Sequence, residues 1–340
     1  MKLIVQIPCY NEEATLAQTV ADIPRQVEGI DNVEILVIDD GSTDRTLEIA
    51  RAAGVDHVIR NSANQGLARA FREGLDASLK LGADIIVNTD GDNQYAGRDI
   101  PKLVRPILDG RADLVIGDRQ TASIPHFSPL KKFFQWLGSN IVRRLSGGLD
   151  VPDAVSGFRA ITRDAAFSIN IVSSFSYTIE MLIQAGKKRL AVTSVPIHTN
   201  EVTRESRLFT GVPSFILKSG TTVLRMFTMY KPLQVFSIIG LLLMLIGLVP
   251  VVRFLVFYFS GEGAGHIQSL IIGGAFIVIG FITFVIALRA DRINFNRRLL
   301  EITLEKTRRM ELMLEQGKDA QAGTQRHGYP SESPERETQE

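Results

Sequence analysis

Two carboxylates stand one residue apart in the stretch DIIVNTDGDNQY, residues 84–95. The apolar run at 85–87 is typical of a strand, and Asp90 and Asp92 follow in a polar turn at its carboxyl end. Open α/β sheets bind ligands at this end of their strands. Carboxylate oxygens suit Mg²⁺ or Mn²⁺, and such an ion would hold a diphosphate. The alternative is a plain Asp-Gly turn, which is common; we favour metal and diphosphate binding.

The segments around this turn alternate between short apolar runs and helical patterns. Strands are predicted at 3–7, 34–38, 57–59, 85–87 and 113–116, with helices between them. Strands that alternate with helices at this spacing indicate an α/β fold with a mostly parallel sheet.

Composition sets broad limits on the class of protein. The chain has 340 residues, enough for about two domains. Its net charge of +1 argues neither for nor against nucleic acid as a partner. The single cysteine, Cys9, cannot form an internal disulfide. The first apolar run is short and stops at Pro8, so we expect a strand there and no signal peptide.

Basic residues without acidic neighbours mark two later stretches. No acidic residue occurs from 119 to 149 or from 206 to 260, and apolar side chains are interleaved with the cations. We expect amphipathic helices on a membrane surface at about 127–146 and 211–230. The alternative is that these helices pack on the sheet with their charges in water.

Two uncharged runs predict a transmembrane hairpin. Helices at about 233–256 and 267–288 are each long enough to cross a hydrocarbon core of ~30 Å. Lysines and arginines precede the first and follow the second, so the positive-inside rule predicts a cytoplasmic location for both termini and the catalytic domain. The predicted parts are a catalytic domain at 1–230, the hairpin at 231–289, a charged helix at 290–316 that is coiled with a neighbour or lies on the membrane, and a disordered tail at 317–340.

Five motifs in order carry a resemblance to a known family. They are IPCYNEE (7–13), VIDDGSTD (37–44), NQGLARA (64–70), TDGDNQY (89–95) and SGFRA (156–160). With the hairpin, they resemble the family 2 glycosyltransferases of GT-A fold, and most of all the polyprenyl-phosphate glycosyltransferases. The Q-x-x-R-W motif of the processive synthases is absent, which argues against chain extension.

The resemblance implies roles for matching residues on the donor side. Pro8, Tyr10 and Glu12 would line the nucleotide pocket. Asp39 or Asp40 would bind base or ribose, since a carboxylate accepts hydrogen bonds from either; the alternative for both is helix capping.

The resemblance also implies the groups around the diphosphate. Asp90, Gly91 and Asp92 would bind the sugar nucleotide, and Asp90, Asp92 and Gln94 would hold Mg²⁺ or Mn²⁺. Gly91 stands where Ala is common in the mannose synthases, which leaves the sugar open.

Cations are implied on the acceptor side. Arg119 and Arg204 would face the diphosphate or the acceptor phosphate, assisted by Ser206 and Arg207. Asp92, Arg119 and Arg204 would therefore carry the chemistry.

The implied reaction is inverting transfer of a hexose from a UDP- or GDP-linked donor, with UDP-glucose and GDP-mannose as leading candidates, to a membrane polyprenyl phosphate. A phosphomonoester is largely ionised at neutral pH because its second pKa is near ~6, so no strong general base is required. The implied partners are the donor, the acceptor and the bilayer, with no nucleic acid; homo-oligomer formation stays open. The alternatives are a different lipid acceptor, a non-catalytic membrane scaffold, and a nucleotidyltransferase, which would need a Gly-rich, Lys-bearing loop.

One acid lies in an apolar helical pattern, Glu180 within YTIEMLIQAG. It is either a buried carboxylate with partners, which we favour, or a residue of the acceptor site.

Overall fold

The computed structural model describes residues 1–120, 139–149, 151–171, 177–200, 225, 227–261 and 263–326. The described strands form a seven-stranded sheet in the order β3-β2-β1-β4-β6-β5-β7. Their bounds are β1 (Lys2–Cys9), β2 (Asn32–Asp39), β3 (His57–Arg60), β4 (Ile85–Asn88), β5 (Leu114–Asp118), β6 (Arg159–Thr162) and β7 (Val192–Pro196). Only β6 runs antiparallel to its neighbours, β4 and β5. The predicted α/β fold with a mostly parallel sheet is confirmed.

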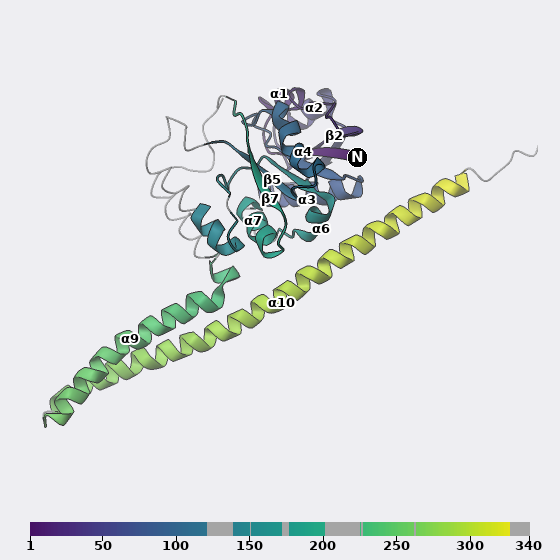
Figure 1. Ribbon diagram of the computed structural model, residues 1–340. Coiled ribbons are helices and arrows are strands. Elements are labelled where there is room, and N and C mark those ends of the chain that lie inside the picture. Colours follow the sequence, from purple (N-terminus) through teal and green to yellow (C-terminus); the bar gives the residue numbers. More distant parts are fainter. Residues whose placement is uncertain are drawn as a thin grey trace, which may run out of the picture.

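Short helices surround the sheet (Figure 1). They are α1 (Leu16–Ala21), α2 (Thr46–Ala52), α3 (Leu67–Lys80), the 3₁₀ turn η1 (Gly97–Asp99), α4 (Ile100–Leu108), α6 (Arg163–Ser168) and α7 (Tyr177–Lys187). Because side chains alternate along a strand, β1 contributes to a core on each face. Ile4 packs in the cluster that contains Phe71 of α3, whereas Val5 packs in the cluster that contains Leu103 of α4. The sheet is thus buried on both faces, as parallel sheets are.

Two long helices follow the domain, α9 (Pro232–Phe259) and α10 (Ile267–Arg326), joined through the short 3₁₀ turn η3 (Gly263–His266). They lie side by side as a hairpin that extends away from the sheet (Figure 1). Both are long and apolar enough to cross a membrane. They are therefore the two candidate membrane-spanning helices that the sequence predicts.

Glycines face each other where α9 and α10 pack. A Cβ atom on Gly240 would lie 2.8 Å from the Gly280 carbonyl oxygen, and one on Gly247 would lie 2.6 Å from that of Gly273. Small residues at such contacts let the backbones of membrane helices approach closely. Helices α9 and α10 accordingly pack against each other at these glycines, while large apolar side chains such as Val249 and Ile271 point outward.

The structure differs from the predicted division of the C-terminal region. Helix α10 continues without a break through position 290, so the second apolar run and the charged helix are one helix. It also extends to Arg326, past the start of the tail predicted from Gly317; residues 327–340 lie outside the described part. Beyond the hairpin, one face of α10 lies on the domain, where Arg309 pairs with Asp164 of α6 at 3.0 Å and Leu312 is buried in the core. This face contacts the chain's own domain.

The two predicted amphipathic stretches fall largely outside the described residues, which exclude 121–138, 201–224 and 226. In the described part of the first stretch, residues 139–146 are helical. Val142 and Leu145 are buried there in the protein, whereas Arg143 and Arg144 are exposed. This arrangement matches the alternative of a helix packed on the domain for these residues.

Candidate functional site

The carboxyl ends of β1, β2 and β4 lie at one edge of the sheet and bring the predicted donor residues together. In the register of the strands, Cys9 at the end of β1 lies opposite Asp39 at the end of β2, and Gln6 of β1 lies opposite Asn88 at the end of β4. The loops that follow these ends carry Tyr10 to Glu12, Asp39 to Asp44, and Asp90 to Asp92.

The surroundings of Asp90 disfavour the ionised form of its carboxyl group. Its Oδ1 atom is inaccessible to solvent, and no group among the described residues donates a hydrogen bond to it. The pKa of Asp90 is raised to about 7, first by burial and then by the negative charges of Asp92 and Glu12, while the positive charge of Arg119 acts in the opposite direction. An unpartnered carboxylate oxygen beside other carboxylates is an environment that a bound divalent cation would stabilise.

The turn after Asp90 presents the second carboxylate. Asp92 Oδ1 accepts a hydrogen bond from the Gln94 backbone N–H at 3.0 Å, and Asn93 between them has a left-handed φ of 58°. Within the described ranges, no three His, Cys, Asp or Glu side chains are grouped so that they could hold a metal. Two carboxylates are nevertheless what Mg²⁺ commonly takes from a protein when substrate phosphates and water complete its coordination. The residues therefore fit an ion shared with a diphosphate; the Gln94 side chain as a ligand stays a prediction.

Helix α1 holds the chain between the two aspartates. The Gly91 carbonyl oxygen accepts hydrogen bonds from Thr15 Oγ1 at 2.8 Å and from Thr19 Oγ1 at 3.2 Å. A Cβ atom on Gly91 would lie 2.9 Å from Cys9 Sγ and 3.2 Å from Glu12 Cγ. The absence of a side chain at Gly91 therefore lets this turn lie directly against β1. The sequence carried no signal for the two threonines, because their role depends on a contact across the fold.

The structure separates the two aspartates of VIDDGS. Asp40 accepts hydrogen bonds from the backbone N–H groups of Gln65 and Gly66, at 3.0 and 2.8 Å from its nearer oxygens, and so holds the loop before α3. Asp39 Oδ1 accepts one from the Ser42 N–H at 2.9 Å. Asp39 Oδ2 is buried and has no hydrogen-bond donor within the described residues. Asp39 therefore retains one oxygen that accepts no hydrogen bond from the described residues, whereas both oxygens of Asp40 accept hydrogen bonds from the protein.

A hollow of about 620 Å³ lies beside Asp39, lined by the loops after β2 and β3. Arg60 lines it, and its Nε lies 3.6 Å from Asp39 Oδ2. The volume is in the range of small-molecule sites. Of the other predicted pocket residues, Pro8 is buried within β1, Glu12 is nearly buried, and Tyr10 is 38% exposed.

Arg119 is at the site but has a partner that the sequence did not reveal. Its Nε and Nη2 atoms lie 2.7 and 3.0 Å from the two carboxylate oxygens of Asp153. Asp153 is fully buried, and Arg119 is close enough to Asp90 to affect its pKa. Such a bidentate pair fixes the plane of the guanidinium group, so Asp153 orients Arg119.

The SGFRA motif forms the wall behind Asp90. A Cβ atom on Gly157 would lie 2.9 Å from Asp90 Oδ2 and 3.0 Å from the Tyr177 hydroxyl. Arg159 is 1% exposed and donates to three backbone carbonyls, those of Ser156, Thr178 and Ala154. The motif therefore shapes the site through packing and backbone hydrogen bonds.

Three predicted acceptor residues, Arg204, Ser206 and Arg207, lie outside the described residues, and their roles stay predictions. The described chain before them ends beside the turn that carries Asp90 and Asp92: Asn200 Nδ2 donates to the Asn93 carbonyl at 3.0 Å, and the Asn200 N–H donates to the Gln94 carbonyl.

Comparison with known proteins identifies the class. The model for "Glycosyl transferase family 2" matches residues 4–167. In 217 aligned residues the chain is 32% identical to a UDP-N-acetylglucosamine–dolichyl-phosphate N-acetylglucosaminyltransferase of Methanococcus voltae, covering 57% of this chain and 83% of that protein. In 209 residues it is 31% identical to a dolichyl-phosphate hexose transferase of Haloferax volcanii, covering 61% and 86%. The chain belongs to glycosyl transferase family 2.

A solved structure shows the same fold. Glucosyl-3-phosphoglycerate synthase from Mycobacterium tuberculosis, in complex with Mn²⁺, UDP and glucosyl-3-phosphoglycerate, aligns with a TM-score of 0.53 at 23% identity, covering 67% of this chain and 78% of that one. The fold is accordingly that of the GT-A glycosyltransferases, and the relatives named above are polyprenyl-phosphate sugar transferases.

Proposed function

We propose that this protein transfers a hexose from a UDP- or GDP-linked donor to a polyprenyl phosphate, with inversion at the anomeric carbon. The observation that carries the proposal is the Asp90–Asp92 turn at the carboxyl end of β4, where one buried carboxylate oxygen has no hydrogen-bond donor among the described residues. Two relatives are named as transferases of dolichyl phosphate, and these names support a polyprenyl phosphate as the acceptor.

The donor side follows from the geometry at the sheet edge. Asp90 and Asp92 would hold Mg²⁺ or Mn²⁺, with Gln94 as a further ligand, and such an ion stabilises negative charge on a departing diphosphate. The hollow beside Asp39 would take the nucleoside.

The transfer itself is a single displacement. An oxygen of the acceptor phosphate forms a bond to the anomeric carbon, the bond from that carbon to the diphosphate oxygen breaks, and the nucleoside diphosphate leaves with the electron pair. Both reactants are anions, so the protein must mainly position them. Arg119, oriented by Asp153, and Arg204, with Ser206 and Arg207, would do so, because guanidinium groups bind phosphates in a bidentate manner.

The hairpin accounts for the lipid acceptor. Helices α9 and α10 would span the bilayer, and the cations that flank them, such as Lys231, Arg289 and Arg292, would place the domain and both termini in the cytoplasm. The catalytic domain, 1–230, would then meet the acceptor phosphate at the membrane surface.

The test uses the full chain in lipid nanodiscs that contain undecaprenyl phosphate. UDP-glucose, UDP-N-acetylglucosamine and GDP-mannose are supplied in turn with Mg²⁺ or Mn²⁺, and glycolipid is detected by mass. We expect one donor to yield a polyprenyl-phosphate sugar and a nucleoside diphosphate. Release of the sugar 1-phosphate would indicate nucleotidyl transfer, and no binding of any donor would indicate a scaffold.

The matched variants are Asp92→Asn and Asp84→Asn, which make the same change on the two sides of β4. Asp84 lies before the strand, where its Oδ2 accepts a hydrogen bond from the Lys2 N–H at 2.7 Å. We expect Asp92→Asn to abolish transfer and Asp84→Asn to retain it. Near-normal turnover in Asp92→Asn would rule out the metal role.

A further inference from the structure

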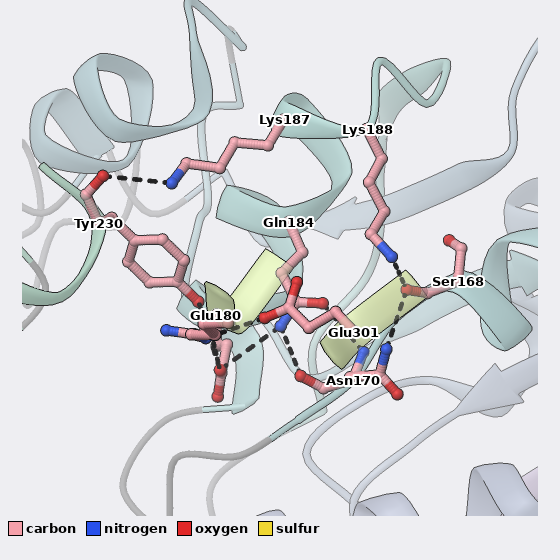
Figure 2. A network of polar contacts seen from close by, with 9 residues as sticks. Ser168, Asn170, Glu180, Gln184, Lys187, Lys188, Tyr230 and Glu301 are labelled. Atoms are coloured by element: carbon pink, nitrogen blue, oxygen red, sulfur yellow. Dashed lines mark hydrogen bonds and ion pairs between the residues drawn. The ribbon is translucent and has the colours of Figure 1, made fainter. Parts of the chain in front are cut away.

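The membrane hairpin contacts the interior of the catalytic domain at one buried carboxylate. Glu180 of α7 is fully buried, and its Oε1 atom lies 3.4 Å from Arg297 Nη2 of α10. The same oxygen accepts a hydrogen bond from the Tyr230 hydroxyl at 3.3 Å, and Tyr230 lies just before α9 (Figure 2). Glu180 is therefore a buried carboxylate with partners, and both α10 and the residue just before α9 meet α7 through it.

Further contacts hold the same part of α7. Lys187 donates to the Tyr230 carbonyl at 3.3 Å (Figure 2), and its Nζ lies 4.2 Å from the centre of the Tyr230 ring. The Arg297 guanidinium carbon lies 4.9 Å from the same ring centre, a range in which cations are attracted to aromatic faces. The carboxyl-terminal half of α7 is thus tied to Tyr230, just before the hairpin.

The amino-terminal end of α7 lies at the donor site, one helical turn before Glu180. The Tyr177 hydroxyl accepts a hydrogen bond from Asn88 Nδ2 at 3.3 Å. Gly157 is in close contact with both this hydroxyl and the Asp90 carboxylate, since a Cβ atom there would lie 3.0 and 2.9 Å from them. A displacement of α7 would therefore move the wall against which Asp90 rests.

We propose that Arg297 is a positioning residue for the donor site, so that the membrane hairpin sets the geometry of the metal-binding turn as well as anchoring the domain. Removing the cation that pairs with a buried carboxylate leaves a buried charge without compensation and strongly destabilises the folded state. Without Arg297, α7 shifts to bring Glu180 to another donor or to water, and Tyr177 shifts with it. This inference rests on the proposed function, because the site concerned is the proposed donor site.

The experiment compares Arg297→Met, Arg297→Lys and a control, Arg309→Met, in the full chain. Arg309 lies on the same helix and pairs with Asp164 of α6 at 3.0 Å, so its loss removes a contact to the domain that does not involve α7. Two quantities are measured in each variant. The first is the affinity for UDP or GDP with Mn²⁺ by calorimetry. The second is the transfer rate with long-chain polyprenyl phosphate in nanodiscs and with a short, water-soluble prenyl phosphate.

We expect Arg297→Met to weaken nucleotide binding and to slow transfer to both acceptors by about tenfold, which is within the usual range for coupled sites. Arg297→Lys should lie between it and the wild type, because lysine keeps the charge but lacks the planar fork, and Arg309→Met should match the wild type. Adding Glu180→Gln to Arg297→Met should recover most of the nucleotide affinity, since the buried negative charge is then gone.

The inference is overturned if Arg297→Met keeps wild-type nucleotide affinity and wild-type rates with the short acceptor and slows only transfer to the long-chain lipid. Arg297 would then serve only to anchor the domain. If Arg297→Met does not fold, the same comparison with Arg297→Lys decides. A wild-type protein that transfers no sugar to either acceptor would instead contradict the proposed function.

Discussion

Gly91→Ala tests how closely the turn that carries Asp90 and Asp92 is packed against β1. The added methyl group would lie 2.9 Å from Cys9 Sγ and 3.2 Å from Glu12 Cγ, whereas non-bonded heavy atoms are most stable at about 3.5–4.0 Å. Cys9 and Glu12 are only 2% and 9% exposed, so neither moves readily into solvent. The hydrogen bonds from Thr15 and Thr19 to the Gly91 carbonyl oppose a shift of the turn itself.

The cost follows from these contacts. Overpacking of a buried site destabilises a protein by about 1–3 kcal/mol. For a domain of roughly 200 residues, each kcal/mol lowers the unfolding midpoint by about 2–4 °C, so Gly91→Ala should lower it by about 2–12 °C. Cys9→Ala removes the closest atom and should cost about 1 kcal/mol alone, as small buried truncations do. In the double variant the methyl group added at position 91 occupies the space of the sulfur, and we expect most of the loss to be recovered.

The assay is the thermal midpoint in detergent, with Mn²⁺-dependent binding of UDP or GDP measured alongside. Gly274→Ala is the control, since a Cβ atom there meets no atom within 4 Å, and it should leave both quantities unchanged. If Gly91→Ala is as stable as the wild type, or if the double variant shows only the sum of the single losses, Cys9 does not exclude a side chain at position 91.

Two further variants test the groups that support the site. Arg159→Lys should greatly lower the yield of folded protein, because one ammonium cannot replace three guanidinium hydrogen bonds and each buried carbonyl left without a donor costs about 1–3 kcal/mol; a normal unfolding midpoint would contradict this. Asp153→Asn should slow transfer by about 10–100-fold, because Arg119 loses its orientation and misplacement of this size is costly. Its nucleotide affinity should change less, and an unaltered rate would show that Asp153 does not act through Arg119.

Local sequence patterns were sufficient to predict the strands and turns that form the site. The apolar runs that predict β1, β2 and β4 are short and end in polar turns, so the carboxyl edge could be located without coordinates. Asp90 and Asp92 belong to one such turn, and their separation is set by the chain itself. The two uncharged runs identify the hairpin in the same way, because length and composition decide whether a helix can cross a bilayer.

Partners distant in sequence were not predictable in the same way. Arg119 and Asp153, or Asp39 and Arg60, are joined by the fold, and neither residue of a pair carries a local mark of the other. The distinction between Asp39 and Asp40 also required the structure. Adjacent residues point to opposite faces of a strand, but only coordinates show that Asp40 is committed to the loop before α3.

Helix α10 shows why the predicted boundary at position 290 is not marked by a break in the helix. The sequence changes there from apolar to charged. Such a change indicates where the surroundings of a helix change from lipid to water, but it does not end the helix, because Leu, Glu, Arg and Lys all favour helix. The charges beyond this point suggested a helix that is coiled with a neighbour or lies on the membrane. In the structure Arg297 meets Glu180 and Arg309 meets Asp164, on two different helices of the domain. One continuous helix therefore joins the candidate bilayer span to the domain, and the influence on α7 that we propose for Arg297 depends on this continuity.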